Sequence, residues 1–440
     1  MESLSGDCPC SLNEAELFDP VAKQIVLSSA KEHKYTPVAS INNSGGVIEF
    51  NVEGSADELI DLNDTELIVS VKVTKTDGSN LAKTDVITPV NNWLHCMFSD
   101  VKLEIGNKAV EGGESLYPYK AYFYNLFTHD YYSKRTQLTN SGWYKDTASA
   151  INAATNNAGV TARRALIAES RTAQLGGPLL LDMMLQNKYL LPNVGLRISL
   201  TQNKPEFQTS IYTATDVANK ATAVKVSILS AELYIRKVKA LPSFIQSIED
   251  NLSLQNAVYP IQRTVMNTFT IPSGVTSHRV QSLFNSDLPK LIFIGVVSNA
   301  AYNGAYGENP FNFNHNNVNG LKLYDSSGTV TFEEYKPDFA NALVAREYNS
   351  LFKAMGIYNQ SENFDITINE FCNGFTIYAF NMTPDAHISG HQQISRQSTL
   401  CLDLTFSAAT TASLSLIAMG VMDARIEITK LRKVICSWMP

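Results

Sequence analysis

The sequence predicts an all-β protein built as two tandem eight-stranded jelly rolls (a double jelly roll), each with one short helix inserted. Three observations predict this fold class: segments with strand periodicity dominate, the same order of elements occurs twice, and strands do not alternate with helices. A chain of 440 residues also exceeds one ordinary core, so two domains are the default expectation.

The predicted strands alternate between apolar and polar residues, or run apolar, and end in turn residues. They cover residues 47–54, 65–73, 100–107, 196–202, 223–238, 290–297, 374–383, 398–406 and 412–434. Two segments instead have helical periodicity, residues 115–130 and 337–356. The second is expected to begin after Pro337 and to end at Gly356, because proline suits a helix start and glycine a helix end.

An internal repeat supports the duplication. His95 is followed six residues later by Val-Lys-Leu, and His315 is followed six residues later by Leu-Lys-Leu, at an offset of 220 residues. Each half also ends in Arg-Lys-Val, at 236–238 and 432–434, where the sequence predicts the end of a long strand. A period near 200 residues is too long for a solenoid or a propeller blade and is typical of a duplicated domain.

The repeat predicts the domain organisation. We expect an N-terminal arm at 1–33, a first jelly roll at 34–240, a linker at 241–258 and a second jelly roll at 259–440. The first half is longer than the second after its helix. The extra residues, 133–164, are rich in Ala, Asn, Thr and Gly, a composition that predicts an exposed surface loop.

Charge and cysteine content exclude several classes of protein. The net charge of −7 and the pI near 5.6 argue against extensive DNA wrapping, although a local basic patch is compatible with them. Six scattered cysteines fit a reducing compartment, and Cys8 and Cys10 lack the second pair that a structural zinc site needs. No signal peptide or membrane-spanning run is recognisable, so we expect a soluble intracellular product.

The sequence predicts no catalytic, cofactor or metal site. None of the seven histidines belongs to a metal-binding motif, and the phosphate-binding and nucleophile motifs are missing. His387 and His391 lie in a loop, and His95 and His315 are interpreted as structural. Asp182 stands alone in an apolar run, either buried with a hydrogen-bond partner or turned to the other side of a strand.

The aromatic segment 310–315 admits two interpretations. Its phenylalanines could form a platform for a ligand, or they could pack between two sheets or at a subunit contact. Packing is favoured, because burial is the usual fate of phenylalanine.

Several segments of the chain, in order, resemble the major capsid proteins of Polinton (Maverick) elements and adintoviruses. They are residues 15–73, 86–110, 137–147, 176–200, 309–328 and 380–385. The resemblance implies a vertical double jelly roll, three copies of which form a pseudo-hexagonal capsomer that tiles an icosahedral shell. It further implies the major capsid protein of a double-stranded DNA virus, made in the host cytoplasm and located in the virion.

The resemblance also implies the partners. They are further copies of the chain, in a homotrimer and in neighbouring capsomers, together with penton and minor or cement proteins. Direct binding to nucleic acid is expected to be weak or missing, and contact with an internal membrane stays open.

Two other functions are considered. A carbohydrate-binding jelly roll predicts paired acids beside exposed tryptophans, and none of Trp93, Trp143 and Trp438 has such a neighbouring pair. A minor shell protein of the same virus would differ from a major capsid protein in copy number.

One surface site is predicted, a basic patch at the ends of the two long strands. Its members are Arg236, Lys237, Lys239, Lys430, Arg432 and Lys433. Because the halves repeat one order, these ends should lie at one level, which the resemblance implies is the inner face of the shell. The hypothesis is a weakly positive floor, and the alternative is that these side chains merely solvate strand ends.

Overall fold

A computed structural model describes residues 24–42, 45–212, 223–285, 287–330, 332–384, 392 and 396–438 of the chain. Cys8, Cys10, His387 and His391 lie outside these described residues, as does most of the predicted N-terminal arm.

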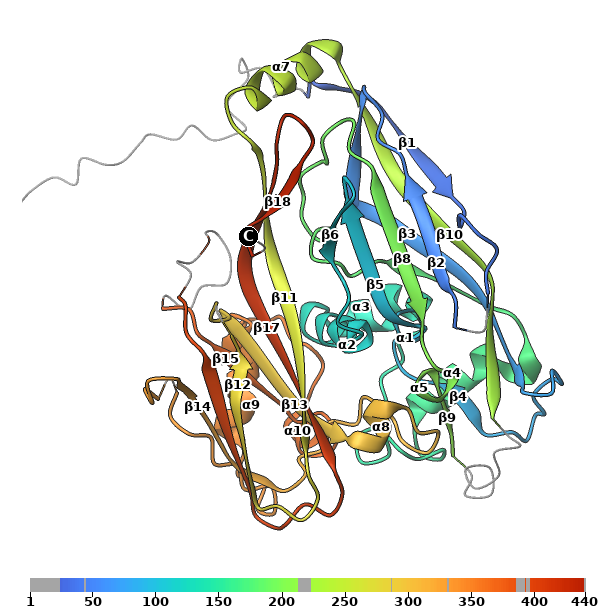
Figure 1. Ribbon diagram of the computed structural model, residues 1–440. Helices are drawn as coiled ribbons and strands as arrows, with labels where there is room; N and C mark the ends of the chain where they lie inside the picture. Colours follow the sequence, from blue (N-terminus) through green and yellow to red (C-terminus); the bar gives the residue numbers. More distant parts are fainter. Residues whose placement is uncertain are drawn as a thin grey trace, which may run out of the picture.

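The first half folds into two antiparallel sheets of four strands each (Figure 1). One sheet has the order β1-β10-β3-β7, with β1 (Leu27–Tyr35), β10 (Val224–Ala240), β3 (Glu58–Lys75) and β7 (Ala173–Pro178). The other has the order β2-β8-β5-β6, with β2 (Val47–Val52), β8 (Leu196–Gln202), β5 (Phe98–Ile105) and β6 (Lys108–Glu111). A separate short pair joins β4 (Ile87–Pro89) to β9 (Thr209–Ile211).

The second half repeats this order in both sheets, with one strand fewer in the second sheet, which confirms the predicted duplication and the fold class. Its first sheet runs β11-β17-β13-β15, with β11 (Ala257–Ile271), β17 (Leu414–Ile428), β13 (Leu291–Ser298) and β15 (Ile377–Asn381). Its second sheet runs β12-β16-β14, with β12 (Ser277–Phe284), β16 (Leu400–Phe406) and β14 (Val318–Asp325). Two isolated bridges, Leu321 to Tyr335 and Tyr324 to Val330, stand where β6 lies in the first half.

Burial explains why the strands carry different sequence patterns. β2 alternates strictly between exposed and buried residues, because only one of its faces covers a core. β13 is buried on both faces. Ile292 and Ile294 face the core of the second barrel, whereas Leu291 and Phe293 face a separate core that residues of both halves share.

The two predicted helices are present, and further short helices lie in the connections. α2 (Tyr117–Thr128) and α9 (Ala345–Ala354) correspond to the predicted pair. α9 begins later than predicted because Asp338 and Leu343 close a tight turn, in which Ala342 has a φ of 56°. The other helices are α1 (Trp93–Cys96), α3 (Tyr131–Arg135), α4 (Ala158–Leu166), α5 (Pro205–Gln208), α7 (Pro242–Leu252), α8 (Asn299–Asn303) and α10 (Ile368–Cys372).

The predicted strand end at 432–434 is wrong. β17 ends at Ile428, and the chain then turns into β18 (Val434–Cys436), which pairs back onto β17. Arg432 has a φ of 62°, a left-handed conformation that a strand cannot continue through. The two Arg-Lys-Val segments are therefore not structurally equivalent, because the first lies within β10 and the second spans the turn before β18.

The prediction of an exposed loop at 133–164 is also wrong. This segment contains α3, a short 3₁₀ turn (Gln137–Ser141) and most of α4, and it buries Trp143, Ile151 and Arg163. Its many small residues allow it to pack between the two barrels, and the large side chains of Trp143, Ile151 and Arg163 are buried there.

Candidate functional site: the joint between the two barrels

An aromatic core joins the two halves of the chain. Tyr122 on α2 stacks on Phe311 of the second half, with ring centroids 4.2 Å apart and an angle of 2° between the rings. Phe127 stacks in the same way on Phe293 of β13 at 4.8 Å. The segment 310–315 therefore packs at an internal joint, as the packing interpretation predicted.

Close packing at this core requires a glycine in β13. A Cβ atom placed on Gly295 would lie 2.5 Å from the ring of Phe313, closer than side-chain atoms approach one another. The ring of Phe313 therefore lies directly against the β13 backbone.

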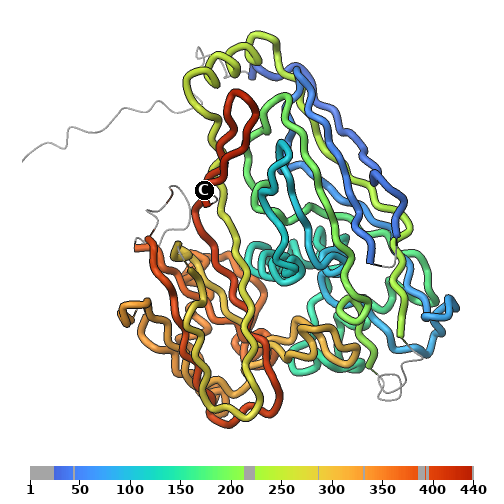
Figure 2. Tube along the Cα trace, viewed as in Figure 1, coloured from blue at the N-terminus to red at the C-terminus, as the bar shows by residue number. Residues whose placement is uncertain are grey.

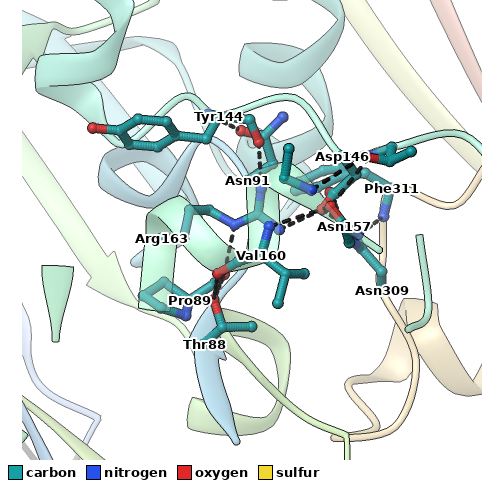
Figure 3. A network of polar contacts seen from close by, with 12 residues as sticks. Thr88, Pro89, Asn91, Tyr144, Asp146, Asn157, Val160, Arg163, Asn309 and Phe311 are labelled. Carbon is teal, nitrogen blue, oxygen red and sulfur yellow. Dashed lines mark hydrogen bonds and ion pairs between the residues drawn. The ribbon is translucent and has the colours of Figure 1, made fainter. Parts of the chain in front are cut away.

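A network around the buried Arg163 links the 133–164 segment to the first barrel and, through Asp146, to the second half (Figure 3). The guanidinium of Arg163, which is fully buried, donates Nε–H to the carbonyl of Pro89 at 2.8 Å and also donates to the carbonyl of Tyr144. Its Nη2 pairs with Oδ1 of Asp146 at 2.5 Å. The other oxygen of Asp146 accepts a hydrogen bond from Asn309 of the second half at 3.0 Å.

Amide side chains complete this network. Asn157 caps the start of α4 by accepting from the backbone N–H of Val160, and it donates to Asp146 at 3.0 Å. Asn91 accepts from the backbone N–H of Tyr144 at 2.7 Å. Both oxygens of Asp146 are thus hydrogen-bonded, which buried carboxylates require.

A buried lysine bridges the two halves beside the aromatic core. The ammonium group of Lys134 donates to the carbonyls of Leu126 and Phe364, both at 2.6 Å. Burial lowers the pKa of Lys134 to about 7, against the opposing attraction of Asp365. Nearby, Lys145 forms an ion pair with Glu370 at 2.8 Å.

A second charged cluster lies farther along the joint. The ammonium group of Lys120 on α2 is paired with Asp182 at 2.7 Å and also contacts Glu111 of β6. The remaining oxygen of Asp182 accepts from the backbone N–H of Thr264 at 2.7 Å, and Glu114 accepts from the N–H of Met266 at 3.2 Å. Two carboxylates of the first half therefore cap N–H groups of β11 in the second half.

This cluster answers the question that the sequence left open for Asp182, which is buried and hydrogen-bonded. Burial raises the pKa of Glu111 to about 7, repulsion from Asp182 adds to the rise, and Lys120 opposes it. The pKa of Lys120 is raised, because its two carboxylates outweigh the cost of burying the charge. A cavity of about 100 Å³ adjoins the cluster and is lined from the second half by Arg263, Thr264 and Met266.

Beyond this cavity, the ends of β11 and β17 together with β18 extend along the first half (Figure 2). The hydroxyl of Tyr259 accepts from the N–H of Leu191 at 3.1 Å and donates to the carbonyl of Tyr189 at 3.2 Å. Arg432 donates Nε–H to the carbonyl of Pro192 at 3.0 Å. The joint therefore runs from this extension through the Lys120 cluster to the aromatic core.

The chemistry of the joint is structural. No group of three potential metal-ligating side chains occurs within the part of the chain that the structure describes. His95 contacts the hydroxyl of Tyr117 at 2.9 Å, and burial lowers its pKa to about 3, so the imidazole is neutral. His315 stacks on Phe339 at 4.5 Å and accepts from the N–H of Asn317. Both environments agree with the structural interpretation of these histidines.

The predicted basic residues gather at one end of the molecule, where α7, the start of β1 and the β17–β18 turn lie together (Figure 1). Most of them have partners. Arg236 pairs with Asp64 at 3.3 Å, Lys239 pairs with Asp57 at 2.9 Å, and buried Lys237 donates to the carbonyl of Glu53 at 2.7 Å. In the second half, Lys430 donates to Ser253 at 2.8 Å and Arg432 pairs with Glu249, while Lys433 is exposed.

Sequence reasoning missed Arg163, Asp146, Lys120 and Lys134. A signal existed for Lys120, which lies in the middle of an aromatic helix, because a buried lysine requires a carboxylate and Asp182 stood equally isolated. For Arg163 the surrounding Ala, Asn and Thr gave no such signal.

Comparison with solved structures shows the same arrangement over nearly the whole chain. The structure from the Sputnik virophage covers 98% of this chain and 92% of its own, with a TM-score of 0.64 and 14% identity. The fold is the double jelly roll. The Faustovirus major capsid protein shares this fold, with a TM-score of 0.59 and 12% identity over 94% of this chain and 93% of the Faustovirus chain. The mavirus major capsid protein shares it too, with a TM-score of 0.55 and 12% identity over 97% of this chain and 93% of the mavirus chain.

Sequence comparison gives one further finding. Uncharacterized protein F54H12.2 of Caenorhabditis elegans is 25% identical over 379 residues, which cover 83% of this chain and 87% of the nematode protein. No protein-family model matches the chain. Among the helices that the structure describes, none is long and apolar enough to cross a bilayer.

Proposed function

We propose that the protein is the major capsid protein of a double-stranded DNA virus, a shell component of the virion and not an enzyme. One observation carries the proposal: the fold matches those of viral major capsid proteins over nearly the full chain. A joint held by aromatic stacking and buried ion pairs suits this role, because a shell subunit must present its two barrels at a fixed angle.

The assembled unit in this proposal is a homotrimer, in which two barrels from each of three copies make a pseudo-hexagonal capsomer. Neighbouring capsomers and penton and minor or cement proteins complete an icosahedral shell. α7 lies in the linker predicted at 241–258, between barrels predicted at 34–240 and 259–440. β1 begins at Leu27, within the predicted N-terminal arm, and β11 begins at Ala257, so both barrels begin slightly earlier than predicted.

The finer assignment in this proposal is to the capsid proteins of Polinton elements and adintoviruses. Segments along the whole chain resemble that family, and the relative in an animal, C. elegans, is compatible with an element resident in animal genomes.

The carbohydrate-binding alternative loses support from the tryptophans. Trp93 and Trp143 are fully buried, so neither can stack on a sugar. Trp438, at the mouth of the cavity, is covered by Arg263, whose guanidinium lies 5.1 Å from the ring.

The test is to express the full chain alone, measure its mass in solution and image its assemblies by electron microscopy. A trimer at physiological salt, with buried contacts above about 2,000 Å² each, is expected. A protein that stays monomeric at high concentration contradicts the proposal. Copy number in purified particles separates a major from a minor shell protein.

The six basic residues are proposed to lie on the inner face of the shell. Because carboxylates pair with several of them, only weak, salt-sensitive binding to DNA is expected. The test is to change Arg236, Lys237, Arg432 and Lys433 to Gln and to assemble particles. Genome packaging and particle stability that match the wild type at every salt concentration would show that these residues only solvate strand ends.

A further inference from the structure

Large apolar side chains are unusually exposed at the end of the molecule where α7 meets the β17–β18 turn. Leu431, in the turn, is 90% exposed, and Leu254, just after α7, is 85% exposed. The hydrogen bond from Lys430 to Ser253 holds these two turns side by side. No other large apolar residue in the described part of the chain is as exposed as either leucine.

Two further apolar side chains continue this surface. Val258 of β11 and Ile435 of β18 both lie opposite Glu427 of β17 in the strand register, and both are more than one-third exposed. We call Leu254, Val258, Leu431 and Ile435 the leucine tip. A contiguous exposed apolar surface of this kind usually marks a contact with a partner or a membrane.

Three exposed lysines flank the leucine tip, whereas the nearby carboxylates already have partners. Glu427 pairs with Arg425, Glu249 pairs with Arg432, and Asp250 accepts a hydrogen bond from Gln246. Lys188, Lys430 and Lys433 are all exposed, and among the described residues no carboxylate forms an ion pair with any of them. Lys188 and Lys430 bind only neutral oxygens, the carbonyl of Val258 and the hydroxyl of Ser253. The other side of this end differs, because Arg236 and Lys239 are each paired with an aspartate.

This combination favours an anionic lipid surface over a protein partner. Protein interfaces are depleted in lysine, and their hot spots are rich in Trp, Tyr and Arg with few leucines. Membrane-surface contacts combine apolar side chains that enter the bilayer boundary with lysines that meet anionic headgroups. The leucines also project from turns, so they can enter a lipid surface without a complementary pocket.

We propose that the leucine tip docks the protein onto an anionic lipid bilayer, with Leu254 and Leu431 entering the headgroup boundary and the three lysines contacting anionic headgroups. The proposal rests on the proposed function, because it gives the inner end of the capsomer a lipid partner. The net charge of −7 makes this local positive surface an exception on an acidic protein.

The test measures flotation of the purified full-length protein with vesicles of phosphatidylcholine containing roughly one-third phosphatidylserine, and with phosphatidylcholine alone. Binding to the anionic vesicles is expected. Leu254→Gln and Leu431→Gln should each weaken it about tenfold. Lys430→Gln and Lys433→Gln should each weaken it about fivefold on anionic vesicles only. Leu343→Gln, a control at a leucine 66% exposed in the turn before α9, should bind as the wild type.

A second measurement reports insertion directly. In Leu431→Trp the emission of the new indole should shift to the blue with anionic vesicles, and brominated lipid should quench it. Unshifted emission, missing vesicle binding, or binding that the leucine variants retain would each overturn the proposal. So would duplex DNA binding that the lysine variants lose and the leucine variants keep, combined with no vesicle binding, because that pattern identifies the genome as the partner.

Light scattering on the same samples separates the two proposals. A trimer that binds no vesicles contradicts the leucine tip alone. A monomer that floats with anionic vesicles contradicts the proposed capsomer and leaves the lipid contact standing. Because all the substituted side chains are exposed, the variants should keep the thermal midpoint of the wild type.

Discussion

The two buried charge clusters of the joint differ in their charge balance. Arg163 meets one carboxylate, Asp146, and two backbone carbonyls, so the cluster is neutral. Lys120 meets two carboxylates, Glu111 and Asp182, so these three groups together carry one excess negative charge unless a carboxylate binds a proton. Burial alone therefore does not make the stability of a charge cluster depend on pH, whereas an unbalanced number of charges does.

The largest expected effect comes from breaking the balanced cluster. Arg163→Ala leaves Asp146 buried without its cation and should lower the free energy of unfolding by about 3 to 5 kcal/mol. Denaturant unfolding measures it. The matched control is Arg164→Ala, since the neighbouring arginine binds only the exposed carbonyl of Lys83 and its loss should cost at most about 0.5 kcal/mol. Equal losses for the two variants would contradict the role of the Arg163 network.

Lys134 is a buried positive charge whose ammonium group donates to two neutral backbone carbonyls. Its pKa is about 7 in the folded protein and 10.5 unfolded, so between these values the unfolded chain binds more protons and stability rises with pH. The rise should amount to about 5 kcal/mol at most. Lys134→Met should flatten the stability profile between pH 7 and 10.5. An unchanged profile in that variant would show that Lys134 does not titrate in this window.

Glu111 tests the Lys120 cluster. Its pKa is raised from 4.5 to about 7, so the folded protein binds the extra proton in this window and stability falls as pH rises through it. The fall should amount to about 3 kcal/mol at most. Glu111→Gln should remove this part of the dependence, as measured by denaturant unfolding from pH 4.5 to 7. A steeper dependence in the variant would contradict the assignment.

The smallest effect is expected outside the joint. Lys239 pairs with Asp57 at 2.9 Å, but both side chains are 55% exposed. Lys239→Gln should therefore leave the free energy of unfolding essentially unchanged at physiological salt. A loss comparable to that of Arg163→Ala would show that this end of the molecule, and not the joint, dominates stability.

The sequence predicted the fold well because its signals are local. Strand periodicity in β2 and the repeated order around β5 and β14 depend only on neighbouring residues. The predicted end of β17 failed for a local reason too, since a left-handed Arg432 leaves no signature in residue type. Three-residue matches such as Arg-Lys-Val are too short to assign structural equivalence.

The sequence predicts the candidate site only in part. An isolated Asp182 and a lysine inside an aromatic helix each indicated a buried charge, but pairing them requires knowing that the segment containing Asp182 passes over α2. Nothing in the composition of residues 133–164 distinguishes a surface loop from a wedge, because small polar residues tolerate both environments.

The sequence by itself determined the all-β class, the duplication and the lack of recognisable catalytic motifs, because periodicity and motif spacing are written along the chain. Only the tertiary structure decided that Trp143, Ile151 and Arg163 are buried and that Asp146 and Asp182 bond the second half. It also decided that two leucines stand exposed beside lysines for which no ion pair occurs among the described residues. These features arise from contacts between residues that are not neighbours in the sequence, such as Asp146 with Asn309 and Lys430 with Ser253. The free energy of burying a charge or exposing a leucine depends on those neighbours and not on the residue alone.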